Sequence, residues 1–262
     1  MSLLETLILG IVQGLTEFLP VSSSGHLELV KAIFGSDYDQ QQGLLITITL
    51  HAATAFSTLF VFRKDIALIL SDLLYFKKGE SLNFSIKILL SMIPAVIIGL
   101  FLEDFVASLF DGKIALVGVM LMITAVLLFL ADRVHENNKK LNYNNAFAVG
   151  IIQAIAILPG ISRSGATIAL AVLLKIDRDK ATRFSFLMVI PLILGSMAKS
   201  IMDGDLSQES TALLPLLVGF VSAFITGVFA CRWMIALVKK SQLKYFSFYC
   251  IAVGILAILF SL

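Results

Sequence analysis

Six long apolar runs constrain this chain more than any other feature of its sequence. They lie near residues 44–62, 84–101, 113–131, 184–202, 211–238 and 245–262. A transmembrane helix needs about 20 mostly apolar residues, and in lipid a helix satisfies its backbone polar groups internally. The chain is 58% hydrophobic and 15% charged, whereas soluble domains average about 45–50% and about 25%. The runs therefore predict an all-α polytopic membrane protein with six transmembrane helices.

Two further apolar runs are broken by prolines and predict re-entrant helical hairpins. The breaks fall at Pro20 and Pro159, and proline disfavours the helical conformation in the residue before it. Each helical piece is too short or too polar to span a bilayer comfortably. The predicted pieces are 3–19 and 22–34 in the first hairpin, and 145–158 and 164–174 in the second.

The charged segments between the spans predict an orientation, because cytoplasmic loops carry an excess of Lys and Arg. The basic segments, expected in the cytoplasm, are 63–83, 132–144, 175–183 and 239–244. The acidic segments, expected outside, are 36–43, 102–112 and 203–210. Both termini then lie outside. The first hairpin enters the membrane from the outside and the second from the cytoplasm.

The two halves of the chain align without gaps at an offset of 140 residues. The residues Gly10, Ile11, Gln13, Ser22, Ser24 and Gly25 match Gly150, Ile151, Gln153, Ser162, Ser164 and Gly165. Each half contains three full spans, an odd number, so the second copy is inverted. The sequence thus predicts one membrane domain, 1–262, made of an inverted repeat with halves at about 1–135 and about 141–262. In such repeats, sites lie near the midplane at broken helices.

The hairpin tips carry the polar side chains expected of an anion site. At the same offset, Ser23 corresponds to Arg163, so a pseudo-two-fold axis would place a hydroxyl opposite a guanidinium. Helix N-termini offer free N–H groups to phosphate, and arginine adds a planar fork of donors. The remaining donors of the predicted cradle are Ser22, Ser24, Ser162, Ser164 and Thr167.

Three residues of the first hairpin are candidates for acid, base or metal chemistry. Gln13 and Glu17 are four residues apart and share a helical face. A carboxylate in an apolar run is a functional candidate, either as a ligand of a divalent cation or as the group that orients a base. His26 follows Ser23 by three residues and could take its proton or protonate a leaving oxygen. Packing, capping and membrane-edge roles are the alternatives.

Two motifs carry a resemblance to a known family. The first is Glu/Gln-x-x-x-Glu followed by Pro-Val-Ser-Ser-x-Gly-His, found here at Gln13–Glu17 and Pro20–His26. The second is Pro-Gly-x-Ser-Arg-Ser-x-x-Thr, found at Pro159–Thr167. With these motifs the chain resembles the bacterial undecaprenyl pyrophosphate phosphatase family, also called BacA, UppP or the bacitracin-resistance family.

The resemblance implies a phosphatase of the bacterial inner (cytoplasmic) membrane that converts undecaprenyl pyrophosphate to undecaprenyl phosphate and inorganic phosphate. This reaction recycles the lipid carrier of cell-wall synthesis and is linked to bacitracin resistance. The family also implies a divalent cation, Mg²⁺ or Ca²⁺, and a site open to the external face. The expected partners are the lipid substrate and the bilayer, without nucleic acid, and a homodimer is left open.

The resemblance leads to one hypothesis for catalysis and two alternatives. Ser23 attacks the terminal phosphorus, His26 acts as base or acid, and Arg163 stabilises the developing charge. Many relatives have Glu where this chain has Gln13, so Glu17 is the expected cation ligand. In one alternative, His26 is the nucleophile. In the other, the protein is an inverted-repeat transporter or flippase for an anionic lipid or solute.

Overall fold

The structure is a computed structural model that describes residues 2–34, 40–75, 79–102, 108–109, 113–135, 138–202 and 213–261. Within these ranges all the regular elements are helices, apart from an isolated bridge between Lys139 and Ile176. The three predicted acidic segments, 36–43, 102–112 and 203–210, fall largely outside the described residues.

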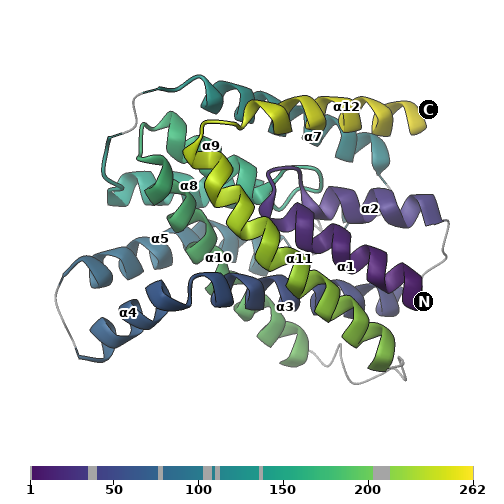
Figure 1. Cartoon of the computed structure of the whole chain (residues 1–262), viewed down its shortest axis with the longest axis horizontal. Helices are drawn as coiled ribbons and strands as arrows, with labels where there is room; N and C mark the ends of the chain where they lie inside the picture. Colours follow the sequence, from purple (N-terminus) through teal and green to yellow (C-terminus); the bar gives the residue numbers. More distant parts are fainter. Residues whose placement is uncertain are drawn as a thin grey trace.

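Both predicted hairpins are present as pairs of short helices. The first consists of α1 (Leu3–Phe18) and α2 (Ser23–Phe34), and the second of α8 (Tyr143–Ile155) and α9 (Arg163–Leu173). The helices of each pair pack against each other, and α1 and α2 lie side by side in Figure 1. The chain breaks at the prolines, as the sequence predicts.

The six predicted spans all coincide with helices. They are α3 (Gln40–Val61), α5 (Glu80–Phe101), α7 (Ile114–Asp132), α10 (Arg178–Met202), α11 (Leu213–Lys239) and α12 (Lys244–Phe260). Among the described residues, α5, α7, α10 and α11 are long and apolar enough to cross a membrane. The bent pair of α3 and α4 (Arg63–Leu74) raises the number from 4 to 5, and α12 is a shorter apolar helix. The prediction of an all-helical, polytopic membrane protein is confirmed.

A helix, α4, lies where the sequence predicts only a basic loop, at 63–83. It turns by 77° from α3. Its residues Ile66 and Ile69 are one turn apart and pack against the core, while Leu70 and Leu74 are exposed. The charged residues at the start of this segment obscured its apolar helical pattern.

Helices of opposite halves of the chain pack closely through glycines. Helix α1 packs against α11, and α8 packs against α5. A side-chain carbon added at Gly10 would lie 1.9 Å from Ser222 Oγ and 2.6 Å from the Gly219 carbonyl oxygen. One added at Gly150 would lie 2.4 Å from the Ser91 carbonyl oxygen. Small residues allow this close approach, and the resulting van der Waals packing drives helix association in lipid.

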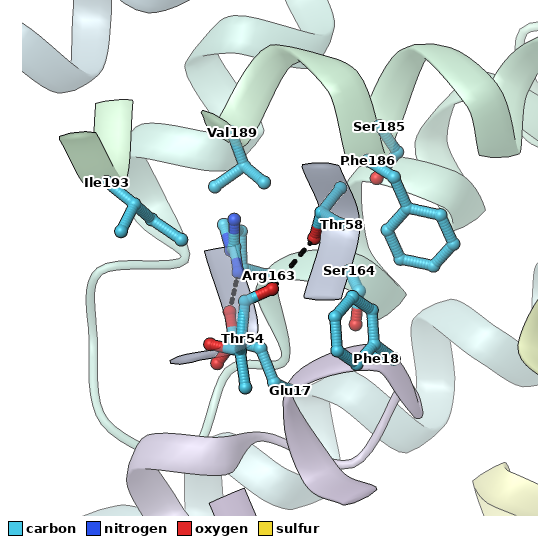
Figure 2. A pocket seen from close by; sticks show the side chains of 10 residues that line it. All are labelled: Glu17, Phe18, Thr54, Thr58, Arg163, Ser164, Ser185, Phe186, Val189 and Ile193. Carbon is cyan, nitrogen blue, oxygen red and sulfur yellow. Dashed lines mark hydrogen bonds and ion pairs between the residues drawn. The ribbon is translucent and has the colours of Figure 1, made fainter. Parts of the chain in front are cut away.

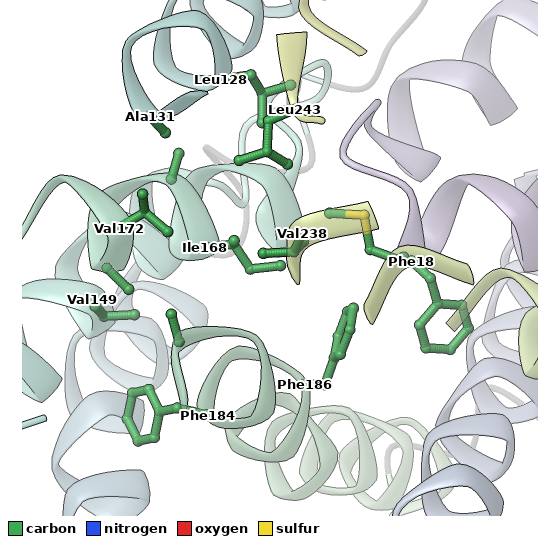
Figure 3. Close-up of a cluster of buried hydrophobic side chains, with 14 of the residues drawn as sticks. Phe18, Leu128, Ala131, Val149, Ile168, Val172, Phe184, Phe186, Val238 and Leu243 are labelled. Carbon is green, nitrogen blue, oxygen red and sulfur yellow. The ribbon is translucent and has the colours of Figure 1, made fainter. Parts of the chain in front are cut away.

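The main hydrophobic core surrounds α9 and fixes the position of the second hairpin. Nearly every residue of α9 from Ser164 to Val172 is buried, and the helix packs against α7, α8 and α10. Figure 3 shows Ile168 and Val172 of α9 within this cluster. Phe18 of the first hairpin also belongs to it and meets Phe186 edge to face, with ring centroids 5.7 Å apart.

The four basic segments of the chain contact one another through polar links. Asp65 pairs with Arg183 at 2.7 Å. The bridge between Lys139 and Ile176 joins the second segment to the third. The Asp132 carboxylate accepts the backbone N–H of Leu243 at 2.8 Å, so the fourth segment is joined as well. In Figure 1 both chain termini lie at the right-hand side of the view, the C-terminus above the N-terminus.

The packing at Gly10 predicts the effect of a single added methyl group. We expect Gly10→Ala to destabilise the protein by about 1–3 kcal/mol, because the new carbon would overlap backbone and side-chain atoms of α11. Gly99→Ala is the matched control, since nothing lies within 4 Å of its added carbon and alanine favours helix. Thermal unfolding in detergent measures both. An unchanged melting temperature for Gly10→Ala would contradict this packing.

Candidate active site

Each hairpin tip is a tight turn that leads into a capped helix. Ser22 and Gly160 have φ angles of 70° and 97°, in the left-handed region. The Ser22 hydroxyl accepts the backbone N–H of Gly25 at 3.3 Å, and the Ser162 hydroxyl accepts that of Gly165 at 3.1 Å. Such N-caps fix the direction of a first helical turn. The two caps therefore aim the N-termini of α2 and α9.

The two tips meet in the interior of the protein. A side-chain carbon added at Gly25 would lie 3.1 Å from Gly160 Cα, and one added at Gly165 would lie 3.0 Å from Pro20 Cβ. The Ser164 hydroxyl also donates to the Leu19 carbonyl oxygen at 3.4 Å. Side chains from both halves of the chain therefore share one site.

The Glu17 carboxylate joins the polar groups of the two hairpins. Its Oε2 accepts hydrogen bonds from Ser23 Oγ at 2.6 Å and from Gln13 Nε2 at 3.0 Å. Its Oε1 pairs with Arg163 Nη2 from the other hairpin. Figure 2 shows Glu17 and Arg163 pointing toward each other. The side chain of Glu17 is only 5% exposed, and a buried carboxylate needs such partners.

A small pocket opens beside this ion pair. Phe18, Phe186, Val189 and Ile193 form an apolar side, and the other lining residues are polar. Figure 2 shows all of them: Glu17, Phe18, Thr54, Thr58, Arg163, Ser164, Ser185, Phe186, Val189 and Ile193. The pocket thus places a guanidinium and hydroxyls beside apolar side chains, as an amphiphilic anion requires.

The other hydroxyls of the predicted cradle form hydrogen bonds to protein groups around the site. Thr167 Oγ1 donates to the Arg163 carbonyl oxygen at 2.7 Å and bonds Ser185 Oγ at 2.6 Å. Ser162 caps α9, and Ser24 Oγ lies 3.4 Å from Ser22 Oγ. Of the predicted cradle hydroxyls, Ser164 lines the pocket. Direct phosphate binding by Ser164 and by the others stays a prediction.

His26 has hydrogen-bond partners that differ from the expected one. Its Nδ1 lies 2.8 Å from the Ser22 carbonyl oxygen, and its Nε2 lies 2.8 Å from the Tyr249 hydroxyl. Ser23 instead bonds Glu17. In this structure the group that accepts a hydrogen bond from Ser23 is Glu17, and the role of His26 as base or acid stays a prediction. The reason is local, because the imidazole folds back onto the carbonyl one turn before it.

Sequence reasoning missed several residues around the site. Thr54 and Thr58 come from α3, Ser185 and Val189 from α10, and Tyr249 from α12. The one available signal was the spacing of four between Thr54 and Thr58, which places two hydroxyls on one face of an apolar helix. None of these residues belongs to either motif.

The Gln13 amide oxygen and the Glu17 carboxylate are oxygen donors of the kind that a hard cation takes. Gln13 Oε1 is buried without a hydrogen-bond partner among the described residues, and Gln13 contacts the Glu17 carboxylate. No group of three or more His, Cys, Asp or Glu among the described residues could hold a metal ion. Mg²⁺ commonly takes one or two carboxylates and completes its shell with water and phosphate. The residues fit that arrangement, rather than an all-protein cage.

The fold and these contacts define a polytopic membrane protein with a buried polar site where two helical hairpins meet. The family profile described as bacitracin resistance protein BacA matches residues 6–256. An undecaprenyl-diphosphatase of Christiangramia forsetii is 57% identical over 261 residues, covering 100% of this chain and 99% of the relative. The chain belongs to the BacA family, and the resemblance based on the two motifs is confirmed.

More distant relatives match over the same length. An undecaprenyl-diphosphatase of Bacteroides fragilis is 44% identical, with 98% of this chain and 97% of the relative covered. One of Halothermothrix orenii is 40% identical, with 99% and 98% covered. The similarity therefore includes both hairpins and all six predicted spans.

The buried ion pair predicts a non-additive effect on stability. Glu17→Gln and Arg163→Gln should each destabilise the protein by about 3–5 kcal/mol, because each leaves an unpaired buried charge. The double variant should lose much less than the sum of the two. Asp179→Asn is the control, since its pair with Lys239 is about half exposed and is worth at most about 1 kcal/mol. Thermal unfolding in detergent measures all four. Additive losses would contradict a direct pair.

Proposed function

We propose that this chain hydrolyses undecaprenyl pyrophosphate to undecaprenyl phosphate and inorganic phosphate. The observation that carries the proposal is the contact of one carboxylate with a hydroxyl and a guanidinium from opposite hairpins. Membership of the BacA family and the names of the relatives support it. The reaction recycles the lipid carrier for cell-wall synthesis and accounts for resistance to bacitracin.

Ser23 is the nucleophile of the proposed reaction. Its Oγ lies 2.6 Å from Glu17 Oε2, within the reach that a general base requires. Ser23 Oγ attacks the terminal phosphorus as Glu17 takes its proton. The bond from that phosphorus to the bridging oxygen breaks, and undecaprenyl phosphate leaves. Glu17 then releases that proton to solvent. Water attacks the phosphoserine as Glu17 takes one of its protons, the bond from phosphorus to Ser23 Oγ breaks, and Glu17 passes the proton to the Ser23 oxygen as inorganic phosphate leaves.

Arg163 and the N-terminus of α9 stabilise charge on the transferred phosphoryl group. In phosphoryl transfer the enzyme contributes mainly positioning and electrostatic stabilisation. Arginine has five N–H donors, and the Glu17 pair occupies one terminal nitrogen, Nη2. Free N–H groups at the start of α9 add a partial positive charge. The burial of α9 keeps these groups in place before substrate arrives.

The apolar side of the pocket accommodates the start of the lipid tail. Phe18 comes from α1, and Phe186, Val189 and Ile193 come from α10; all four line the pocket that Arg163 also lines. A pyrophosphate on Arg163 would then have its first isoprenyl unit against these side chains. This combination favours a lipid pyrophosphate over a free anion.

Gln13 and Glu17 would hold a divalent cation, Mg²⁺ or Ca²⁺. Support comes from the buried, unpaired Gln13 oxygen beside the carboxylate. When bound, the cation would neutralise charge on the pyrophosphate oxygens. The same two residues orient Ser23 through the Glu17 carboxylate, whether or not a cation is present.

The proposed topology has six spans and two re-entrant hairpins in an inverted repeat. Two pairs of contacts support the repeat. The 140-residue offset turns the contact of Gly25 with Gly160 into that of Gly165 with Pro20. It also turns the contact of Gly10 with α11 into the contact of Gly150 with α5. In each case the contacted helix is the middle span of the opposite half.

The proposed orientation places both termini outside and opens the site to the external face. The mutual contacts of the four basic segments support a single cytoplasmic face. The pairing of copies into a homodimer stays a prediction.

Phosphate release from farnesyl pyrophosphate by detergent-purified protein tests the proposed reaction. We expect Ser23→Ala to lose at least roughly a thousandfold in kcat, since it lacks the attacking oxygen. Arg163→Lys should lose on the order of a hundredfold, because it lacks the planar donor fork. EDTA should abolish release and Mg²⁺ should restore it. His135→Ala, on an exposed segment, is the control.

Each arm of this experiment has a contradicting outcome. Full activity in Ser23→Ala would exclude Ser23 as nucleophile, and full activity in EDTA would exclude the cation. A folded wild-type protein that releases no phosphate would favour the transporter alternative, because transport needs two compartments and hydrolysis does not.

A further inference from the structure

The Tyr249 hydroxyl connects α12 to the first hairpin through His26. Tyr249 OH and His26 Nε2 are 2.8 Å apart, and the two rings are nearly parallel, at 12°. His26 is 8% exposed and Tyr249 is 44% exposed. The residues are separated by 223 positions in the chain. A polar contact between such distant segments, at one turn from Ser23, calls for a functional explanation.

The other ring nitrogen of His26 determines which tautomer is present. Nδ1 faces the Ser22 carbonyl oxygen at 2.8 Å, and a carbonyl can only accept a hydrogen bond. Nδ1 therefore carries the proton. In the neutral imidazole, Nε2 is then an acceptor, so the Tyr249 O–H is the donor. Tyr249 thus donates to the tautomer in which His26 holds Ser22.

Ser22 is the residue of the tip that most needs this support. Its φ of 70° is uncommon for a residue with a side chain. Its carbonyl accepts both the backbone N–H of His26, at 3.1 Å, and the imidazole Nδ1–H. Ser23 follows it directly. The conformation of Ser22 thus sets where the Ser23 hydroxyl lies relative to Glu17.

We infer that Tyr249 is a positioning residue that acts through His26 to hold the tip of the first hairpin and the Ser23 hydroxyl in place. A second contact comes from the same helix, because the Cys250 thiol lies 3.7 Å from the Pro20 carbonyl oxygen, within hydrogen-bonding range for sulfur. Helix α12 therefore holds the turn on both sides of Ser22. This role rests on the proposed function, in which Ser23 is the nucleophile.

The test combines the imidazole spectrum with kinetics. The chain has only three histidines, so long-range ¹H–¹⁵N spectra of protein labelled at histidine can resolve His26, with His26→Gln for assignment. We expect the Nδ1–H tautomer in the wild type. In Tyr249→Phe, the Nε2 resonance should move toward that of an unbonded imidazole nitrogen. Tyr245→Phe is the matched control, because Tyr245 lies on the same helix and is exposed.

The kinetic arm measures phosphate release from farnesyl pyrophosphate. Tyr249→Phe should lower kcat about tenfold and leave KM nearly unchanged, since Tyr249 is not among the residues that line the pocket. Tyr245→Phe should change neither constant. Partial loss of fold would also lower the apparent kcat at an unchanged KM. The kcat of each variant is therefore normalised to its folded fraction, which the intensity of the His26 resonance measures.

The two arms fail separately. An unchanged Nε2 resonance in Tyr249→Phe, or the Nε2–H tautomer in the wild type, would overturn the hydrogen bond and with it the inference. A moved resonance with unchanged kcat would overturn the positioning role. A wild-type protein that shows the expected spectrum and releases no phosphate would instead overturn the proposed function, because the spectrum is recorded without substrate.

Discussion

Glu17 and Arg163 each carry a charge into an apolar interior, and neither is stable there without the other. Removal of a charged side chain from water has a cost of several kcal/mol that only close, well-oriented partners offset. Glu17 receives three such partners, from Gln13, Ser23 and Arg163. Two hairpins from distant parts of the chain must therefore meet at one point, and the packing around them serves that requirement.

The two hairpins share their backbone features but carry different polar side chains. The hairpins share their proline breaks, serine caps and close glycine contacts. At the positions that matter for the reaction they differ. The first supplies Glu17 and Ser23, where the second has Ile157 and Arg163. The proposed enzyme thus takes its acid–base group and nucleophile from one copy and its anion-binding group from the other.

Much of the fold could be predicted from the sequence because lipid restricts the choices. Apolar runs and prolines predicted the positions of both hairpins and of the six helices that coincide with the expected spans. The match of Ser23 with Arg163 in the repeat predicted that the two hairpin tips face each other. The short helix α4 was missed because charged residues at its start obscured an apolar pattern.

The finer geometry of the site depends on contacts that no local pattern encodes. Tyr249 is 223 positions from His26, and neither residue signals the other. The spacing of three residues along one helix predicts a contact between Ser23 and His26, with His26 as base or acid. Instead, the left-handed turn at Ser22 directs its carbonyl to His26, and Ser23 reaches back to Glu17. Backbone conformation at one residue thus decides which of two nearby groups accepts the hydrogen bond of Ser23.

The most direct test of this account is to identify the residue that carries phosphate during turnover. Wild-type protein would be mixed with a lipid pyrophosphate, quenched within one turnover at neutral pH, digested, and mapped by mass spectrometry. The account predicts phosphate on Ser23, in the peptide that contains the first hairpin tip. Phosphate on His26 would contradict it, because the imidazole would then have to leave both Ser22 and Tyr249 to reach the substrate.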